Sequence, residues 1–198
     1  MKKHNSTYHM SILSILIAII ILQDFIPVLG NIPIGPLSLT TLHITVIITA
    51  IVLGPVDGAI VGGVWGVITW IRAFTMPSSP LAPLVFVNPL VSVVPRIFIG
   101  LIAGWLFLGL MKVIKKPVVP MVIAAIGGAL TNTLLVLGFI YLFYHTPAVA
   151  QAYGVNVDHL FKALLAIFAT NGLAEMVLAA IIAPAIATPL RRLHHRTK

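Results

Sequence analysis

The sequence predicts an all-α integral membrane protein with six transmembrane helices, and its composition and length carry this prediction. Of the 198 residues, 60% are hydrophobic and 8% are charged, whereas a soluble domain carries about 25% charged residues. Such a chain has too little polar surface to cover a water-soluble globule, so its main solvent is lipid. A span with its connection takes roughly 33 residues, so the length holds about six spans and no sizeable extramembrane domain.

Apolar runs separated by Gly- and Pro-rich connections divide the single membrane domain, residues 1–198, into helices. The first run follows a basic segment, but no small-residue cleavage site comes after it, so we interpret it as a helix and not as a signal peptide. Gly62, Gly63 and Gly66 in the third helix indicate close helix packing. The predicted helices cover about residues 11–28, 39–53, 59–74, 90–113, 118–144 and 159–188.

The basic residues predict the orientation of these helices. Of twelve Lys and Arg residues, nine lie on one side of the six-helix arrangement, and only Arg72 and Lys162 flank the other. The positive-inside rule therefore makes both termini cytoplasmic. The long outer connections are then placed to close over a binding site. The nine cations are Lys2, Lys3, Lys112, Lys115, Lys116, Arg191, Arg192, Arg196 and Lys198.

Several function classes lack the residues that they need. There is no cysteine, and no helix carries a His or carboxylate cluster with the spacing of a metal site. We find no phosphate loop and no nucleophile elbow. A net charge of +8 would suggest nucleic acid for a soluble protein, but here the cations orient the helices. We therefore expect no catalytic residues, no metal, no cofactor and no nucleic-acid partner.

Polar residues inside the membrane are the candidate site. Arg96 lies 16 residues before Lys112, which places it roughly 24 Å from the cytoplasmic side. Asn132 reaches a similar depth, roughly 21 Å along its helix. A charge at this depth is rare unless it faces a cavity or a partner. The substrate-binding candidates are Arg96, Asn132, His43, Asn88, Asn171, Glu175 and Trp65, the last as packing or as a pocket floor.

Each candidate also has a structural explanation. Arg96 could pair with Glu175 and hold two helices together, and Asn132 could be an interhelical hydrogen-bond clip. His43 could reach the outer interface or be a buried histidine with its hydrogen bonds satisfied. A proton relay through Glu175, His43 and Arg96 would make the protein an autonomous secondary transporter. We find no inverted repeat of the kind that such transporters usually show, and no catalytic constellation for an intramembrane enzyme.

Five segments of the sequence, in order, carry a resemblance to one known family. They are TLHI at 41–44, LGPVDG at 53–58 followed by Gly62, NPLVSVVPR at 88–96 followed by Gly100, TNT at 131–133 and NGLAE at 171–175. Each motif alone is weak, but their order, the length and the six-helix topology make the combination fairly specific over nearly the whole chain. Together they resemble the substrate-binding S components of energy-coupling factor (ECF) vitamin transporters.

The resemblance implies a non-catalytic subunit of a bacterial cell membrane that binds a vitamin from outside. Such S components join a transmembrane coupling protein, the T component, and two cytoplasmic ATPases, and are thought to topple in the bilayer to release substrate. The family docks through an Ala-x-x-x-Ala face on its first helix. Ser14 and Ala18 keep this small-residue spacing here, with Ser in place of the first Ala.

Within the family, the segment NPLVSVVPR at 88–96 looks closest to the pantothenate-type branch. Hydroxymethylpyrimidine, pyridoxine and folate members share much of this pattern and remain alternatives. The carboxylate of pantothenate would suit the Arg96 guanidinium through a bidentate pair. Asn132, Asn171 and His43 could serve its amide and hydroxyl groups.

Overall fold

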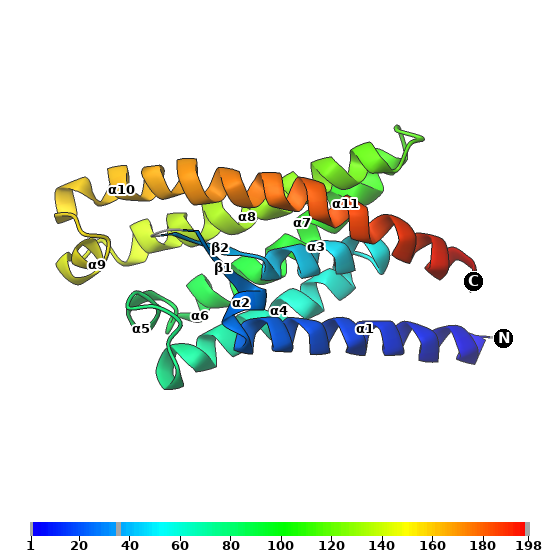
Figure 1. Cartoon of the computed structure of the whole chain (residues 1–198), viewed down its shortest axis with the longest axis horizontal. Helices are drawn as coiled ribbons and strands as arrows, with labels where there is room; N and C mark the ends of the chain where they lie inside the picture. The colour runs from blue at the N-terminus through cyan, green and yellow to red at the C-terminus, as the bar shows by residue number, and fades with distance from the viewer. Residues whose placement is uncertain (1, 35–36, 197–198) are drawn as a thin grey trace.

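The computed structural model describes residues 2–34 and 37–196, and it is almost entirely helical (Figure 1). One predicted cytoplasmic cation, Lys198, lies outside the described residues, as do the side chains of Lys2, Lys3 and Arg196. In chain order the elements are α1 (Lys2–Phe25), α2 (Pro27–Gly30), β1 (Asn31–Ile34), β2 (Leu37–Thr40), α3 (Leu42–Val52), α4 (Pro55–Thr75), α5 (Ala82–Val85), α6 (Pro89–Ser92), α7 (Val94–Met111), α8 (Val118–Phe143), α9 (Pro147–Ala152), η1 (Val157–His159), α10 (Leu160–Ile167), η2 (Phe168–Gly172) and α11 (Leu173–Arg196).

Five helical segments in the described chain are long and apolar enough to cross a membrane. They run roughly along the long axis of the molecule (Figure 1). The beginning of α1, the turn from α7 to α8 and the end of α11 lie at one end of the bundle, while α5 and α9 lie at the other (Figure 1). The five segments are Thr7–Phe25, Pro55–Thr75, Pro89–Met111, Val118–Phe143 and Val157–Leu193.

The remaining predicted helix, residues 39–53, differs from the structure in length and in start. It begins at Leu42 and is an apolar helix of 11 residues, α3, which rises about 16 Å and so covers about half of a bilayer core. All of its side chains are buried, because α1, α4, α7, α8 and α11 pack around it. Its uniform apolarity thus reflects a central position among other helices.

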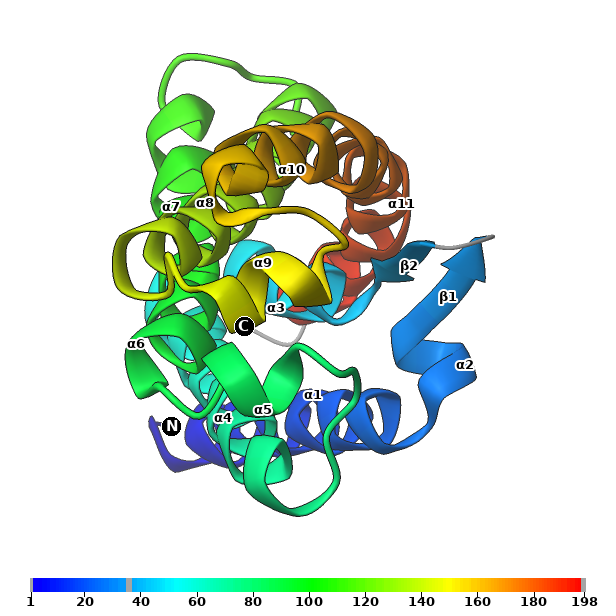
Figure 2. The same cartoon turned by 90° about the vertical axis from the view of Figure 1, so that its left-hand side faces the viewer.

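The connection before α3 contains a short antiparallel hairpin that the sequence pattern did not predict. Strands β1 and β2 pair from Asn31 with Thr40 to Ile34 with Leu37. Thr41 closes the base of the hairpin, because its N–H donates to the Gly30 carbonyl oxygen at 2.9 Å. In the end-on view the hairpin stands at the rim of the bundle beside α11 (Figure 2).

The last predicted helix, residues 159–188, is one continuous helical segment with a local change of winding. Residues Phe168–Gly172 form a single π-helical turn, η2, between α10 and α11. Such turns insert an extra residue into an α-helix and are frequent at functional sites. The winding of the helix therefore changes between Asn171, which lies in the π-helical turn, and the buried Glu175, which lies in the first turn of α11.

Glycines let α4 and α7 approach each other at backbone contact. A Cβ at Gly62 would overlap the Arg96 carbonyl group, and one at Gly66 would lie 2.7 Å from the Val93 Cα. The prediction of close packing is therefore confirmed at Gly62 and Gly66. At Gly63 the nearest atom would be an Ile97 side-chain carbon at an ordinary 3.6 Å, so this glycine is not required for the contact.

We predict that Gly100→Ala destabilises the protein, whereas Gly109→Ala in the same helix does not. A Cβ at Gly100 would overlap the backbone of Gly58 and Ala59, but a Cβ at Gly109 meets nothing within 4 Å. Overpacking of this kind costs about 1–3 kcal/mol, which lowers the melting temperature by about 2–12 °C for a chain of this size. Thermal unfolding of both variants in the same detergent measures the difference, and equal shifts would contradict the prediction.

Candidate functional site

The guanidinium of Arg96 is buried against two aromatic rings. Its Cζ lies 4.9 Å from the centroid of the Trp65 ring and 5.1 Å from that of Phe86. Arg96 is 5% exposed, and its Nη1 donates to the Val91 carbonyl oxygen at 2.7 Å. Its Nε is buried without a hydrogen-bond partner in the described structure. A buried cation that is only partly satisfied is costly, and it is therefore suited to an anionic ligand.

A cavity of about 120 Å³ opens beside this guanidinium. Trp65, Arg96 and Asn132 line it, so three of the predicted site residues meet at one place. The other lining residues come from α1, β2, α3, α4 and the connection before α6. They are Asp24, Thr40, Leu42, Thr69, Arg72, Ser78 and Phe86.

Asp24 and Arg72 are wall residues that sequence reasoning did not select. Nη1 of Arg72 donates to Asp24 Oδ2 at 2.7 Å and also to the Asp24 carbonyl oxygen, so the end of α1 is tied to the end of α4. The Arg72 Cζ lies 5.4 Å from the Phe25 ring centroid. Nothing local in the sequence showed that the two helix ends that carry Asp24 and Arg72 converge. Arg72 and Arg96 against the single Asp24 carboxylate give the wall a positive balance.

Glu175 does not form the ion pair with Arg96 that the sequence left open. Among the described residues, no carboxylate oxygen lies within 4 Å of an Arg96 nitrogen, the distance that defines an ion pair. The two ion pairs found there join Arg72 to Asp24 and His9 to Asp57. Glu175 Oε1 instead accepts a hydrogen bond from the Thr40 backbone N–H at 2.9 Å. The buried carboxylate thus anchors strand β2 to α11.

Besides Arg96, three of the predicted polar residues carry buried atoms without a hydrogen-bond partner in the described chain. These atoms are both ring nitrogens of His43, Oδ1 of Asn132 and Oδ1 of Asn171. Native proteins satisfy the large majority of such atoms, so these three are capable of ligand or water contacts. Only Asn132 belongs to the cavity wall, whereas His43 lies within α3 and Asn171 lies in the π-helical turn.

Asn88 has a local structural role. Its Oδ1 accepts a hydrogen bond from the Leu90 N–H at 3.0 Å and caps α6. The Asn88 carbonyl oxygen also accepts from the Ser92 hydroxyl at 3.0 Å. This capped turn sets the direction in which the chain enters α7, where Arg96 lies. Asn88 is not among the cavity-lining residues.

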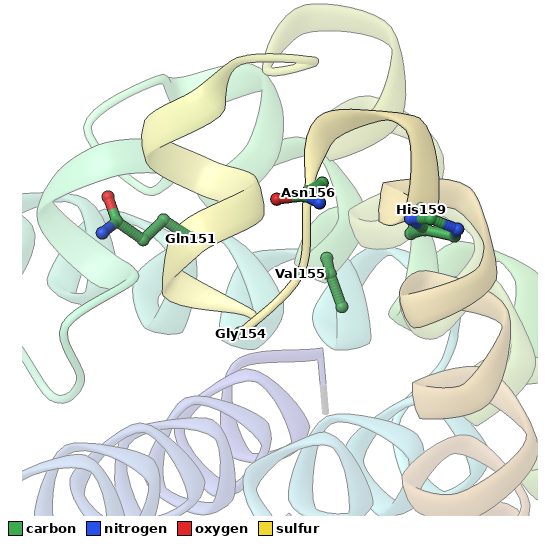
Figure 3. A pocket seen from close by; sticks show the side chains of 5 residues that line it. All are labelled: Gln151, Gly154, Val155, Asn156 and His159. Carbon is green, nitrogen blue, oxygen red and sulfur yellow. The ribbon is translucent and has the colours of Figure 1, made fainter.

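A larger surface hollow, of about 540 Å³, lies in the connection from α9 to α10. Its lining residues, shown in Figure 3, are Gln151, Gly154, Val155, Asn156 and His159. Most of them are exposed, and Gln151 lies apart from Asn156 and His159 (Figure 3). None of them is shared with the Arg96 cavity, so this hollow is a feature of one surface connection. In the described chain, no group of three or more His, Asp or Glu residues could hold a metal ion.

On α1, the predicted docking residues Ser14 and Ala18 are exposed, one helical turn apart. Apolar neighbours Ile15 and Ile19 are 59% and 39% exposed. The opposite face of α1 packs into the bundle through the buried Leu16 and Ile20. The outward face of α1 therefore presents small and apolar side chains.

Comparison with known proteins agrees with this architecture. Residues 9–187 match the family model described as "ECF transporter, substrate-specific component". The chain is 33% identical to a protein named pantothenate transporter PanT of Leuconostoc mesenteroides, over 94% of each chain. It is 32% identical to a protein named pantothenic acid transporter PanT of Lactococcus lactis, over 97% of each chain. With its several apolar helices, the chain belongs to the family of substrate-specific components of ECF transporters, and it is a multi-pass membrane protein.

Proposed function

We propose that this protein captures pantothenate at the outer face of a bacterial plasma membrane. It then delivers the vitamin through a T component and two cytoplasmic ATPases. The buried Arg96 beside a cavity is the observation that carries the proposal, because a carboxylate would supply the anionic partner that the guanidinium lacks. Two relatives over nearly the full length are named as pantothenate transporters, which supports this vitamin over hydroxymethylpyrimidine, pyridoxine or folate.

The proposed topology has six crossings with both termini in the cytoplasm. We assign α3 as the sixth crossing beside the five long spans. The 11 residues of α3 rise about 16 Å, which is about half of the roughly 30 Å of a bilayer core, and its side chains are buried among the longer helices. This arrangement is consistent with both ends of the described chain lying at one end of the bundle.

The proposed ligand geometry assigns the carboxylate to Arg96 and the amide to Asn132. Arg72 and Asp24 complete the polar wall, Trp65 and Phe86 hold the guanidinium in place, and His43, Asn171 and Glu175 form a surrounding polar group. The cavity of about 120 Å³ is smaller than the roughly 300–1,000 Å³ of typical ligand pockets. We therefore propose that an outer segment moves when the vitamin enters, and we assign this movement to the hairpin.

We predict that Arg96→Ala abolishes the preference for a carboxylate. Wild-type protein should bind pantothenate far more tightly than pantothenol, in which an alcohol replaces the carboxylate. The variant should bind both compounds about as weakly as the wild-type protein binds pantothenol. Removing one partner of a buried charge pair costs about 2–5 kcal/mol, or roughly 30- to several-thousand-fold in affinity. Calorimetry on purified protein measures all four affinities.

The pantothenol arm is the control for this experiment. A variant that has merely lost its packing against Trp65 would lose pantothenol binding as well. Pantothenate binding retained at wild-type affinity in Arg96→Ala would make Arg96 structural and would overturn its assignment.

We predict that Glu175→Ala speeds vitamin release about tenfold, while Glu175→Gln leaves it within about threefold. The alanine variant loses the acceptor for the Thr40 N–H and frees the hairpin, and a hydrogen bond to a charged group contributes about 1.5–3 kcal/mol. The glutamine variant keeps an oxygen at this position. Stopped-flow dissociation of labelled pantothenate measures both rates, and a glutamine variant as fast as the alanine variant would contradict the anchoring role.

The alternative function is an autonomous proton-coupled transporter with Glu175 as the titrating group. We predict that cells accumulate labelled pantothenate through this protein only when the T component and active ATPases are present. The expected result is loss of uptake with inactive ATPases while binding to the cells persists. Accumulation that needs no ATPase and collapses with the proton gradient would establish the alternative.

The outward face of α1 is the proposed docking surface for the T component. Ser14 and Ala18 are small and exposed, which allows a partner helix to approach closely. The face opposite to them is already used for packing within the bundle. This division of α1 into an inner and an outer face supports the docking assignment.

A further inference from the structure

A second cavity, of about 740 Å³, lies at the end of the bundle opposite to α5 and α9. The turn between α7 and α8 and the last turns of α11 form its walls. Met111, Val118 and Met121 contribute apolar surface, and Val118 is half-exposed. Three candidate spans end or begin here, so the cavity lies at the level where lipid headgroups meet the hydrocarbon.

Four cations converge on this cavity from two separate segments. They are Lys115 and Lys116 from the α7–α8 turn and Arg191 and Arg192 from α11. The Cζ of Arg191 lies 4.6 Å from the Phe107 ring centroid, so its side chain is oriented by the bundle. None of the lining residues is acidic, and the four acidic residues of the chain, Asp24, Asp57, Asp158 and Glu175, are elsewhere in the sequence.

The N-terminus of α8 adds to the positive potential of the cavity. α8 is a helix of 26 residues that begins at Val118, and Val118 and Val119 line the cavity. The N–H groups of Val118 and Val119 have no carbonyl within the helix to bond. Pro120 has no N–H, and the Met121 N–H donates to the Pro117 carbonyl oxygen. The helix dipole favours an anion at this end. Lysine, arginine and a helix N-terminus are together suited to a phosphate group.

We propose that this cavity binds the phosphate headgroup of an anionic phospholipid. The apolar wall beside the cations matches an amphiphile, because a headgroup contacts the charges while an acyl chain lies against Val118 and its neighbours. Basic pockets between membrane helices on the cytoplasmic side are suited to such headgroups. The site is distinct from the Arg96 cavity, with which it shares no lining residue, and the inference does not depend on the vitamin.

The positive-inside rule alone does not require this convergence. It needs only an excess of cations on one side of the membrane. Lys112 satisfies the rule without joining the cavity, since it is exposed in the same turn and does not line it. Lys112 therefore provides a matched control for the lining cations.

The test measures lipid binding to the full chain in detergent by native mass spectrometry. Wild-type protein is titrated with phosphatidylglycerol, phosphatidylcholine or inorganic phosphate. The pocket variant Lys116→Gln/Arg192→Gln removes one cation from each segment, and the control variant Lys112→Gln/Lys162→Gln removes the same charge elsewhere. Melting temperatures in lipid-free detergent check that both variants are folded.

We expect wild-type protein to retain phosphatidylglycerol at least tenfold more tightly than phosphatidylcholine. The pocket variant should lose about fivefold for each cation removed, while the control variant stays within twofold of wild type. Equal losses in both variants would overturn the site, because the attraction would then follow net charge alone. Displacement of phosphatidylglycerol by an equal concentration of inorganic phosphate would overturn the lipid assignment in favour of a free anion.

Discussion

The structure keeps one guanidinium, that of Arg96, buried in the bundle, and no carboxylate among the described residues forms an ion pair with it. Arg96 is held by the rings of Trp65 and Phe86 and by the Val91 carbonyl group. Aromatic faces attract a cation most strongly when water is excluded, but they do not replace a full anionic partner. The surroundings of Arg96 therefore define a place where a carboxylate is stabilised.

The close contact of α4 with α7 is what sets this geometry. Gly62 brings the backbone of α4 against the Arg96 carbonyl group, and Trp65 follows one turn later on α4. A side chain at residue 62 would push the two helices apart and move the Trp65 ring away from the guanidinium. The glycines of α4 thus have a role in the site as well as in packing.

We assign the hairpin as the cover of the cavity, because Thr40 both lines the cavity and donates its N–H to Glu175. Hydrogen bonding to a carboxylate is strong enough to hold a strand, and its net contribution of about 1.5–3 kcal/mol is small enough for the strand to be released. The same bundle presents a separate basic cavity at its other end. The proposed vitamin site and the proposed lipid site therefore lie at opposite ends of one molecule.

Sequence alone determined the properties that depend on local composition. Apolar runs with few charges predicted the long helices, and the sequence motifs predicted the ECF family, which a family model over residues 9–187 confirms. Charged and polar residues are rare inside apolar segments, and this rarity was enough to select Arg96 and Asn132, which do line one cavity. A charge in lipid is costly wherever the chain folds, so this signal needs no tertiary information.

Only the tertiary structure decided which distant groups meet. Glu175 bonds to Thr40 and not to Arg96, Asp24 and Arg72 join the cavity wall, and residues 42–52 are a short central helix. These outcomes depend on helix packing, a π-helical turn and a hairpin, which bring together residues far apart in the chain. Composition and periodicity describe each segment by itself, so they do not predict which segments come into contact.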